Sequence, residues 1–213
     1  MTRMGPSYSA VYFGAKPNSK DSEKNAKLTT NALRRAYLMS PKIKYPTISM
    51  DEFDQLNPLK VERFKFRNLA GTMLQGYLYP LPSGKSNKVI ILGHGFSAHS
   101  GMMAPLIPLF HKIGYNVFLF DFNTHGKSKG RKTSIGYHEA DDIASAMLEM
   151  GRIYGDKVRI AYAGHSMGGA AFFYIPEKLR NDRPEAVEWI EKHLDGKIVL
   201  DSTYDVTSVR FIS

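Results

Sequence analysis

Four short runs of apolar residues recur along the chain, and each is nearly continuous rather than alternating with polar residues. They occupy positions 89–92, 117–120, 158–163 and 198–200. Strands that are covered on both faces of a sheet have this pattern, because neither face contacts water. Segments with helical periodicity separate the runs, at 100–114, 137–155, 167–175 and 184–194. This order predicts an α/β fold, with a mostly parallel sheet and helices on both faces. The helix at 137–155 has one apolar face, which is predicted to pack on the sheet and consists of Ile143, Met147, Met150 and Ile153.

The organisation of the chain changes at about residue 58. Residues 1–58 are polar and interrupted by prolines, and we interpret them as an N-terminal extension with one amphipathic helix at 27–39. Residues 59–213 are interpreted as a single α/β domain. Its first part, 61–81, contains two segments that predict a pair of strands connected by a turn from Asn68 to Gly71.

Composition limits the class of protein. The chain has 213 residues, of which 43% are hydrophobic, enough for one domain with a real core. It contains no cysteine, which excludes disulfides, thiolate metal sites and cysteine nucleophiles. The net charge of +9 would suit a nucleic-acid binder. Because no zinc-finger spacing or aromatic RNA-binding signature accompanies it, we expect an ordinary basic surface and no specific nucleic-acid partner.

Membrane insertion is not expected. No apolar run approaches the roughly 18–20 residues of a membrane-spanning helix, and the N-terminal residues make a poor signal peptide. The sequence therefore favours a soluble, cytoplasmic protein. Peripheral contact with a membrane stays open, and the sequence does not indicate the oligomeric state.

The segment from Gly164 to Gly168, GHSMG, lies where a predicted strand ends and a predicted helix begins. A strand that turns directly into a helix forces the middle residue, Ser166, into a strained backbone, and small neighbours relieve the crowding. The hydroxyl is then exposed at the sheet edge. The first backbone N–H of the helix, at Met167, can face the oxyanion that forms when Ser166 attacks a carbonyl.

A second oxyanion donor is expected from the loop that follows the strand at 89–92. Gly93, His94, Gly95 and Phe96 stand at its carboxyl end. In open parallel sheets, ligands bind beyond the carboxyl ends of the strands. Both glycine-containing segments should therefore meet at one edge, and the N–H of Phe96 is the candidate donor.

Three motifs, in this order, resemble those of the α/β-hydrolase superfamily, in its serine-aminopeptidase-like and monoglyceride-lipase-like branch. They are GHGFSAHSG at 93–101, DFNTHGKS at 121–128 and GHSMGG at 164–169. The resemblance extends over about 61–205. The middle motif differs from the Asp-x-Arg-Gly-x-Gly that relatives often carry, since the arginine and first glycine are absent. That loop is interpreted as one that tunes local structure.

The resemblance implies a serine hydrolase acting on an ester, thioester or amide. Ser166 would be the nucleophile, the N–H groups of Phe96 and Met167 would form the oxyanion hole, and no metal or organic cofactor would take part. The substrate would be a small-molecule or lipid-like acyl compound.

The acid and base of such an enzyme are not evident in the sequence. The family order is serine, acid, histidine, yet all seven histidines precede Asp201. Among them, His165 is expected to pack beside the elbow, and His94 to make structural hydrogen bonds. Asp201 and Asp205 follow the last apolar run. Either could be the acid that orients a histidine, and the alternative for Asp201 is that it fixes the loop after its strand.

Two explanations fit this arrangement. In the first, the 213 residues are the amino-terminal part of a longer hydrolase, whose sheet continues past the sixth strand and whose base and acid lie elsewhere. In the second, the chain is a non-catalytic binding module that uses the same fold. A late aspartate and histidine in a longer reading frame would favour the first explanation.

Overall fold

The computed structural model describes residues 10–13, 48–84, 86–201 and 203. For residues 10–13 only the backbone is described. The amphipathic helix predicted at 27–39 and the candidate acid Asp205 lie outside these residues.

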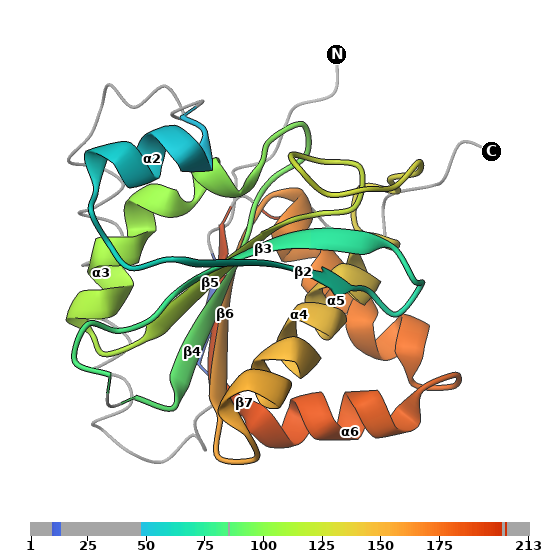
Figure 1. Ribbon diagram of the computed structural model, residues 1–213. Helices are drawn as coiled ribbons and strands as arrows, with labels where there is room; N and C mark the ends of the chain where they lie inside the picture. Colours follow the sequence, from blue (N-terminus) through green and yellow to red (C-terminus); the bar gives the residue numbers. More distant parts are fainter. Residues whose placement is uncertain (1–9, 14–47, 85, 202, 204–213) are drawn as a thin grey trace.

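A single mixed sheet forms the centre of the molecule (Figure 1). Four neighbouring strands, in the order β7-β6-β4-β5, run parallel to one another. They are β4 (Lys88–Gly93), β5 (Asn116–Asp121), β6 (Arg159–His165) and β7 (Leu194–Asp201). All four coincide with the predicted apolar runs, so the mostly parallel α/β sheet is confirmed.

Two antiparallel strands, β3 (Met73–Tyr79) and β2 (Glu62–Arg67), complete the sheet beside β5. They form the predicted strand pair. The turn between them is closed by Asn68, whose side-chain oxygen accepts a hydrogen bond from the Thr72 N–H at 2.7 Å. Gly71 has a φ of 83°, a backbone conformation that favours glycine.

The opposite edge of the sheet carries a strand that the sequence did not predict. Residues Ala10–Phe13 form β1, which pairs antiparallel with β7, from Ala10 opposite Leu200 to Phe13 opposite Lys197. The complete order is β1-β7-β6-β4-β5-β3-β2. Part of the predicted N-terminal extension therefore pairs with the sheet.

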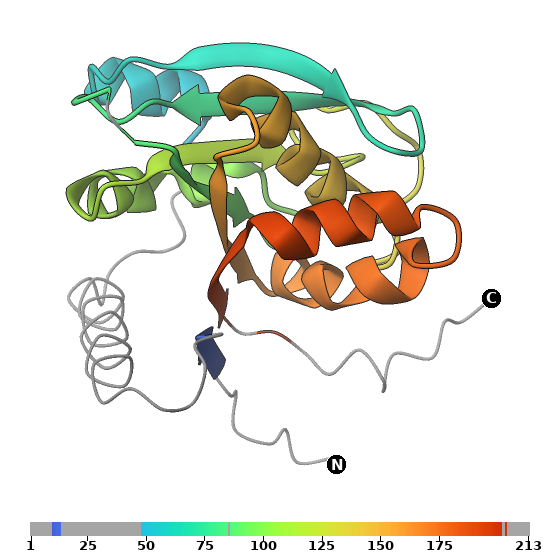
Figure 2. The same ribbon diagram turned by 90° about the horizontal axis from the view of Figure 1, so that it is seen from below.

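Helices cover both faces of the sheet, as predicted (Figures 1 and 2). One face carries α4 (Glu139–Tyr154), α5 (Met167–Leu179) and α6 (Pro184–His193), and the other carries α2 (Met50–Leu56) and α3 (Ile107–Lys112). Consecutive residues of β4 belong alternately to the two cores: Val89 and Ile91 to the first, Ile90 and Leu92 to the second. This explains why the run at 89–92 is continuously apolar.

Helix α4 presents nearly the face that its sequence predicted. Ile143, Met147 and Met150 are fully buried, but Ile153 is 38% exposed. Tyr154 packs against the core in its place. Ile153 and Tyr154, three and four positions after Met150, can both lie on the same helical face as Met150. In the structure, Tyr154 is the one that packs against the core.

Helix α2 lies within the segment interpreted as an extension. Ser49 caps it by accepting a hydrogen bond from the Glu52 N–H, and Met50 and Phe53 are buried in the second core. Residues that pack on the sheet therefore begin before position 59. None of the helices in the described part of the chain is long and apolar enough to span a membrane.

Candidate active site

Ser166 is the single residue between β6 and α5, since β6 ends at His165 and α5 begins at Met167. Its φ of 49° and ψ of −114° are unfavourable for a residue with a side chain. The strained turn expected at this position is therefore present. The residue is partly exposed at the carboxyl edge of the sheet.

The glycines of this turn are required by close backbone contacts. A Cβ atom on Gly164 would lie 2.7 Å from the backbone of Gly168, and one on Gly168 would lie 2.6 Å from the carbonyl oxygen of Gly93. The start of α5 thus rests directly on the end of β4. Gly93 and Gly164 are also register partners in the sheet. The two glycine-containing segments meet in space as the sequence predicted.

The loop that carries Phe96 passes next to Ser166. A Cβ atom on Gly95 would lie 3.5 Å from the Cβ of Ser166. The Phe96 ring is 49% exposed and contacts the ring of His125 edge-on, with centroids 5.8 Å apart. On the other side, Met167 is the first residue of α5, so its N–H has no acceptor within the helix. The assignment of these two N–H groups to an oxyanion hole stays a prediction.

His94 supports this loop from beneath. It is fully buried; its Nδ1–H donates to the Gly95 carbonyl at 2.8 Å, and its Nε2 accepts from the Phe122 N–H at 3.1 Å. Burial lowers the pKa of His94 to about 4, which keeps the ring neutral near pH 7. Both ring nitrogens are engaged with the backbone, in agreement with the structural role expected for this histidine.

The middle motif fixes two neighbouring loops. The buried carboxylate of Asp121 accepts hydrogen bonds from the N–H groups of Ser100 and Lys127, each at 2.8 Å. His125 donates from Nδ1 to the Asn123 carbonyl at 2.8 Å and accepts at Nε2 from the Ser97 N–H at 3.3 Å. The 121–128 segment therefore holds the loop after β4 in place.

Asp201, a candidate acid, orients a histidine that the sequence analysis did not pair with it. Its Oδ2 lies 2.9 Å from Nδ1 of His165. Its backbone carbonyl accepts a hydrogen bond from the Ser166 N–H at 2.8 Å. His165 and Asp201 are register partners at the ends of β6 and β7. The sequence could have indicated this contact only if the two strands had been expected to be neighbours that end at these two residues.

Tyr162 is a further contributor that sequence reasoning missed. This fully buried side chain lies beneath the elbow, and its hydroxyl donates to the Gly168 carbonyl at 2.7 Å. A Cβ atom on Gly93 would overlap the same hydroxyl, at 2.1 Å. Tyr162 lies inside a continuous apolar run, where nothing in the sequence distinguishes it from an ordinary core residue.

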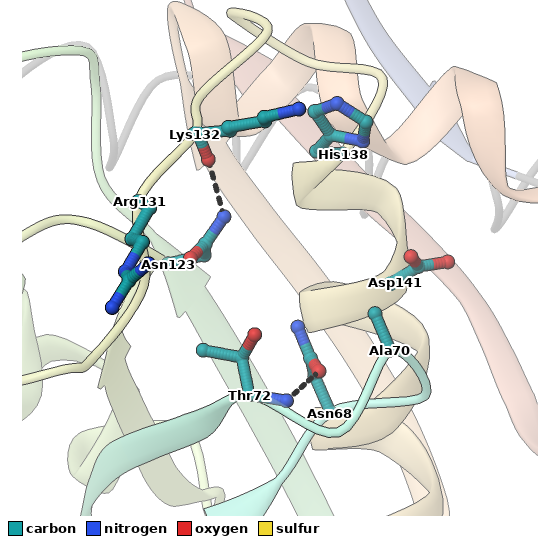
Figure 3. Close-up of a pocket in the computed structure, with 8 residues that line it drawn as sticks. All are labelled: Asn68, Ala70, Thr72, Asn123, Arg131, Lys132, His138 and Asp141. Atoms are coloured by element: carbon teal, nitrogen blue, oxygen red, sulfur yellow. Dashed lines mark hydrogen bonds between the residues drawn. The ribbon is translucent and has the colours of Figure 1, made fainter.

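A pocket of about 240 Å³ lies away from the elbow, between the β2–β3 turn and the start of α4 (Figure 3). The residues that line it are Asn68, Ala70, Thr72, Asn123, Arg131, Lys132, His138 and Asp141. A second hollow, of about 430 Å³, is lined by residues of β2 and β3 together with Lys127. Neither hollow includes Ser166, so neither defines a cavity for an acyl substrate.

No group of three or more potential metal ligands comes together among the residues that the structure describes. Chemistry without a metal or cofactor stays a prediction.

Residues 84–187 match the family model described as serine aminopeptidase, S33. The uncharacterized protein YfhR of Escherichia coli is 32% identical over 152 residues, which cover 70% of this chain and 49% of YfhR. The uncharacterized protein YqkD of Bacillus subtilis is 26% identical over 140 residues, covering 60% of this chain and 45% of YqkD. The chain thus spans about half the length of these relatives.

A solved structure shows the same fold. The esterase Pf2001 of Pyrococcus furiosus superposes with a TM-score of 0.51 and 29% sequence identity, over 55% of this chain and 46% of the esterase.

Proposed function

Because this chain belongs to the α/β-hydrolase superfamily, we propose that it forms the nucleophile-bearing part of a serine hydrolase, in which Ser166 attacks an acyl carbonyl. The observation that carries the proposal is the strained backbone of Ser166, at a one-residue connection between β6 and α5. Strain of this kind persists where the surrounding structure enforces it, and it is concentrated at functional sites.

In the proposed reaction, the Ser166 oxygen forms a bond to the carbonyl carbon of an ester, thioester or amide. The carbonyl oxygen becomes negatively charged and is stabilised by the N–H groups of Phe96 and Met167. The serine proton passes through a general base to the leaving group, which departs and leaves an acyl-enzyme. Water, activated by the same base, then releases the acid and restores the hydroxyl.

The general base is proposed to come from sequence outside these 213 residues. The acid that orients this base is proposed to lie there too, because the Asp201 carboxylate is bound to His165; Asp205 is the alternative within the chain.

The name esterase, borne by the Pyrococcus furiosus protein, favours an ester among the three substrate classes. A lipid-like acyl substrate and peripheral membrane contact are part of the proposal.

A non-catalytic binding module is the second candidate. What favours it is the engagement of both ring nitrogens of His94 and of His125 with backbone groups. These two histidines of the neighbouring loops therefore do not have a free nitrogen to accept the proton of Ser166.

A fluorophosphonate probe separates the two candidates. The experiment uses the longest form of the protein that its gene encodes, the Ser166→Ala variant, and Ser83→Ala as a control at an exposed loop serine. A hydrolase is labelled in the wild type and in the control but not in Ser166→Ala. Labelling that survives Ser166→Ala would refute the nucleophile assignment. A folded wild type that is not labelled favours the binding module.

A further inference from the structure

His165 and Asp201 connect three elements of the candidate site. Asp201 is the last residue of β7, and His165 is the last residue of β6, immediately before Ser166. The two side chains are joined by the 2.9 Å hydrogen bond between Nδ1 and Oδ2. The same aspartate binds the Ser166 N–H through its backbone carbonyl. One residue of β7 therefore holds both the elbow backbone and the imidazole beside it.

The imidazole of His165 reaches from this pair to the loop after β4. A Cβ atom on Gly95 would lie 3.0 Å from Cδ2 of His165 and 3.7 Å from its Nε2. The outer edge of the ring therefore packs directly on the backbone of Gly95. The next peptide N–H along the chain belongs to Phe96, the predicted oxyanion donor.

The pair is mostly shielded from water. The His165 side chain is 13% exposed and that of Asp201 is 29% exposed. A hydrogen bond that fixes a ring in a packed position limits the movement of whatever the ring contacts, because close-packed interiors transmit small displacements. Here the contacted group is the backbone that precedes Phe96.

From these contacts we infer that His165 and Asp201 are a positioning pair, which sets the spacing between the Phe96 N–H and Ser166. Asp201 fixes the imidazole, and the imidazole holds the Gly95 backbone against the elbow. This inference rests on the proposed function, since it assigns the pair a role in the reactivity of Ser166.

A positioning pair differs from two other possible roles in the effects expected from substitutions. If Asp201 were the acid of a catalytic triad, replacement by asparagine would reduce the rate by about 10⁴-fold, because the histidine would adopt the wrong tautomer. If His165 were the proton acceptor, its removal would nearly abolish the reaction. A positioning pair tolerates asparagine at position 201, because asparagine still offers an oxygen to the Nδ1–H group. When the contact is broken, the rate at Ser166 falls only by the amount that a displaced Phe96 N–H group causes.

The experiment measures fluorophosphonate labelling of Ser166 in the full-length protein at a series of probe concentrations. Two quantities are obtained for each variant: the labelling rate at saturating probe, and the probe concentration that gives half of this rate. The variants are His165→Phe, which keeps a ring but loses the donor, Asp201→Asn, which keeps an acceptor, and Asp201→Ala, which removes it. His138→Phe and Asp182→Asn are matched controls at exposed positions.

The expected result is a 10- to 100-fold lower saturating rate for His165→Phe and Asp201→Ala, with an unchanged half-saturating concentration. The size follows from the effect of a displacement of up to about 1 Å at a reacting centre. Asp201→Asn should remain within about threefold of the wild type. The double variant His165→Phe/Asp201→Ala should be no slower than the slower single variant, because the pair acts as a unit.

Saturating rates within threefold of the wild type for His165→Phe and for Asp201→Ala would overturn the inference. So would a loss of about 10⁴-fold in Asp201→Asn, or a loss in His165→Phe as complete as that in Ser166→Ala. Thermal unfolding of each variant identifies any that fails to fold, and Asp201→Asn with His165→Phe then decides, because both preserve side-chain shape. Absence of labelling in the wild type would contradict the proposed function itself, a separate outcome.

Discussion

Replacing Gly168 with alanine tests whether the contact between α5 and β4 sets the reactivity of Ser166. The added Cβ would lie 2.6 Å from the Gly93 carbonyl oxygen and 2.8 Å from that of His94. Ordinary contacts begin near 3.4 Å, so the start of α5 would have to move by about 0.8 Å. Both neighbours are backbone atoms, which cannot rotate away as a side chain could.

Two effects are expected from this displacement. Overpacking costs about 1–3 kcal/mol, and the better helix propensity of alanine offsets up to about 1 kcal/mol. The free energy of unfolding should therefore fall by about 0–3 kcal/mol. The movement also carries Ser166 and Met167 away from the loop of Gly95. A displacement of this size should lower the saturating rate of fluorophosphonate labelling by roughly 10- to 100-fold.

The matched control is Gly151→Ala. A Cβ atom there would lie 2.3 Å from Cζ2 of Trp189, at the packing of α4 against α6. This variant should lose stability and keep its labelling rate. Urea unfolding and labelling kinetics on both variants complete the assay. If Gly168→Ala is destabilised but labelled as fast as the wild type, the spacing between α5 and β4 does not control reactivity and the reasoning fails.

Two further predictions concern stability. Tyr162→Phe removes the hydrogen bond to the Gly168 carbonyl and should lower the unfolding free energy by about 1 kcal/mol, seen as a lower urea midpoint at constant m-value; an unchanged midpoint would contradict the role given to this hydroxyl. Burial raises the pKa of Asp142 to about 7, above the value near 3.9 of an unfolded aspartate, so its contribution to stability falls as pH rises from about 4 to 7. The unfolding free energy of Asp142→Asn relative to the wild type should therefore increase by about 3 kcal/mol between pH 5 and pH 8. The lowered pKa of His94 acts in the opposite sense between pH 4 and 6.5, but both proteins carry it and it cancels in the difference; a difference that does not vary with pH would refute the prediction.

The sequence predicted those features of the fold that depend on neighbouring residues in the chain. The run at 89–92 indicated a strand covered on both faces, and the structure places its residues alternately in the two cores. The turn at Ser166 was predictable for the same reason, because a strand and a helix separated by one residue leave few backbone conformations. The start of α6 is a third case, since the helical segment predicted at 184–194 begins at the proline where the helix begins.

Features that depend on which strands are neighbours could not be predicted in this way. The contact of His165 with Asp201 requires that β6 and β7 be adjacent and end in register, and 36 residues separate the two positions. The pairing of β1 with β7 joins segments from opposite ends of the chain. The sequence around Ala10–Phe13 gives no indication of its partner.

The glycines of the site were only partly predictable from the sequence, and their contacts show what determines the geometry of the site. Their small size was evident from the sequence, but the atoms that exclude a larger residue were not: backbone for Gly164 and Gly168, the Tyr162 hydroxyl for Gly93, and the His165 ring for Gly95. Most of these contacts are made by the backbone or by fully buried groups. The position of Ser166 relative to the loop of Phe96 is therefore set by the packing of β4, β6 and α5 on one another, and changes at these four glycines should affect reactivity more than changes to the exposed ring of Phe96.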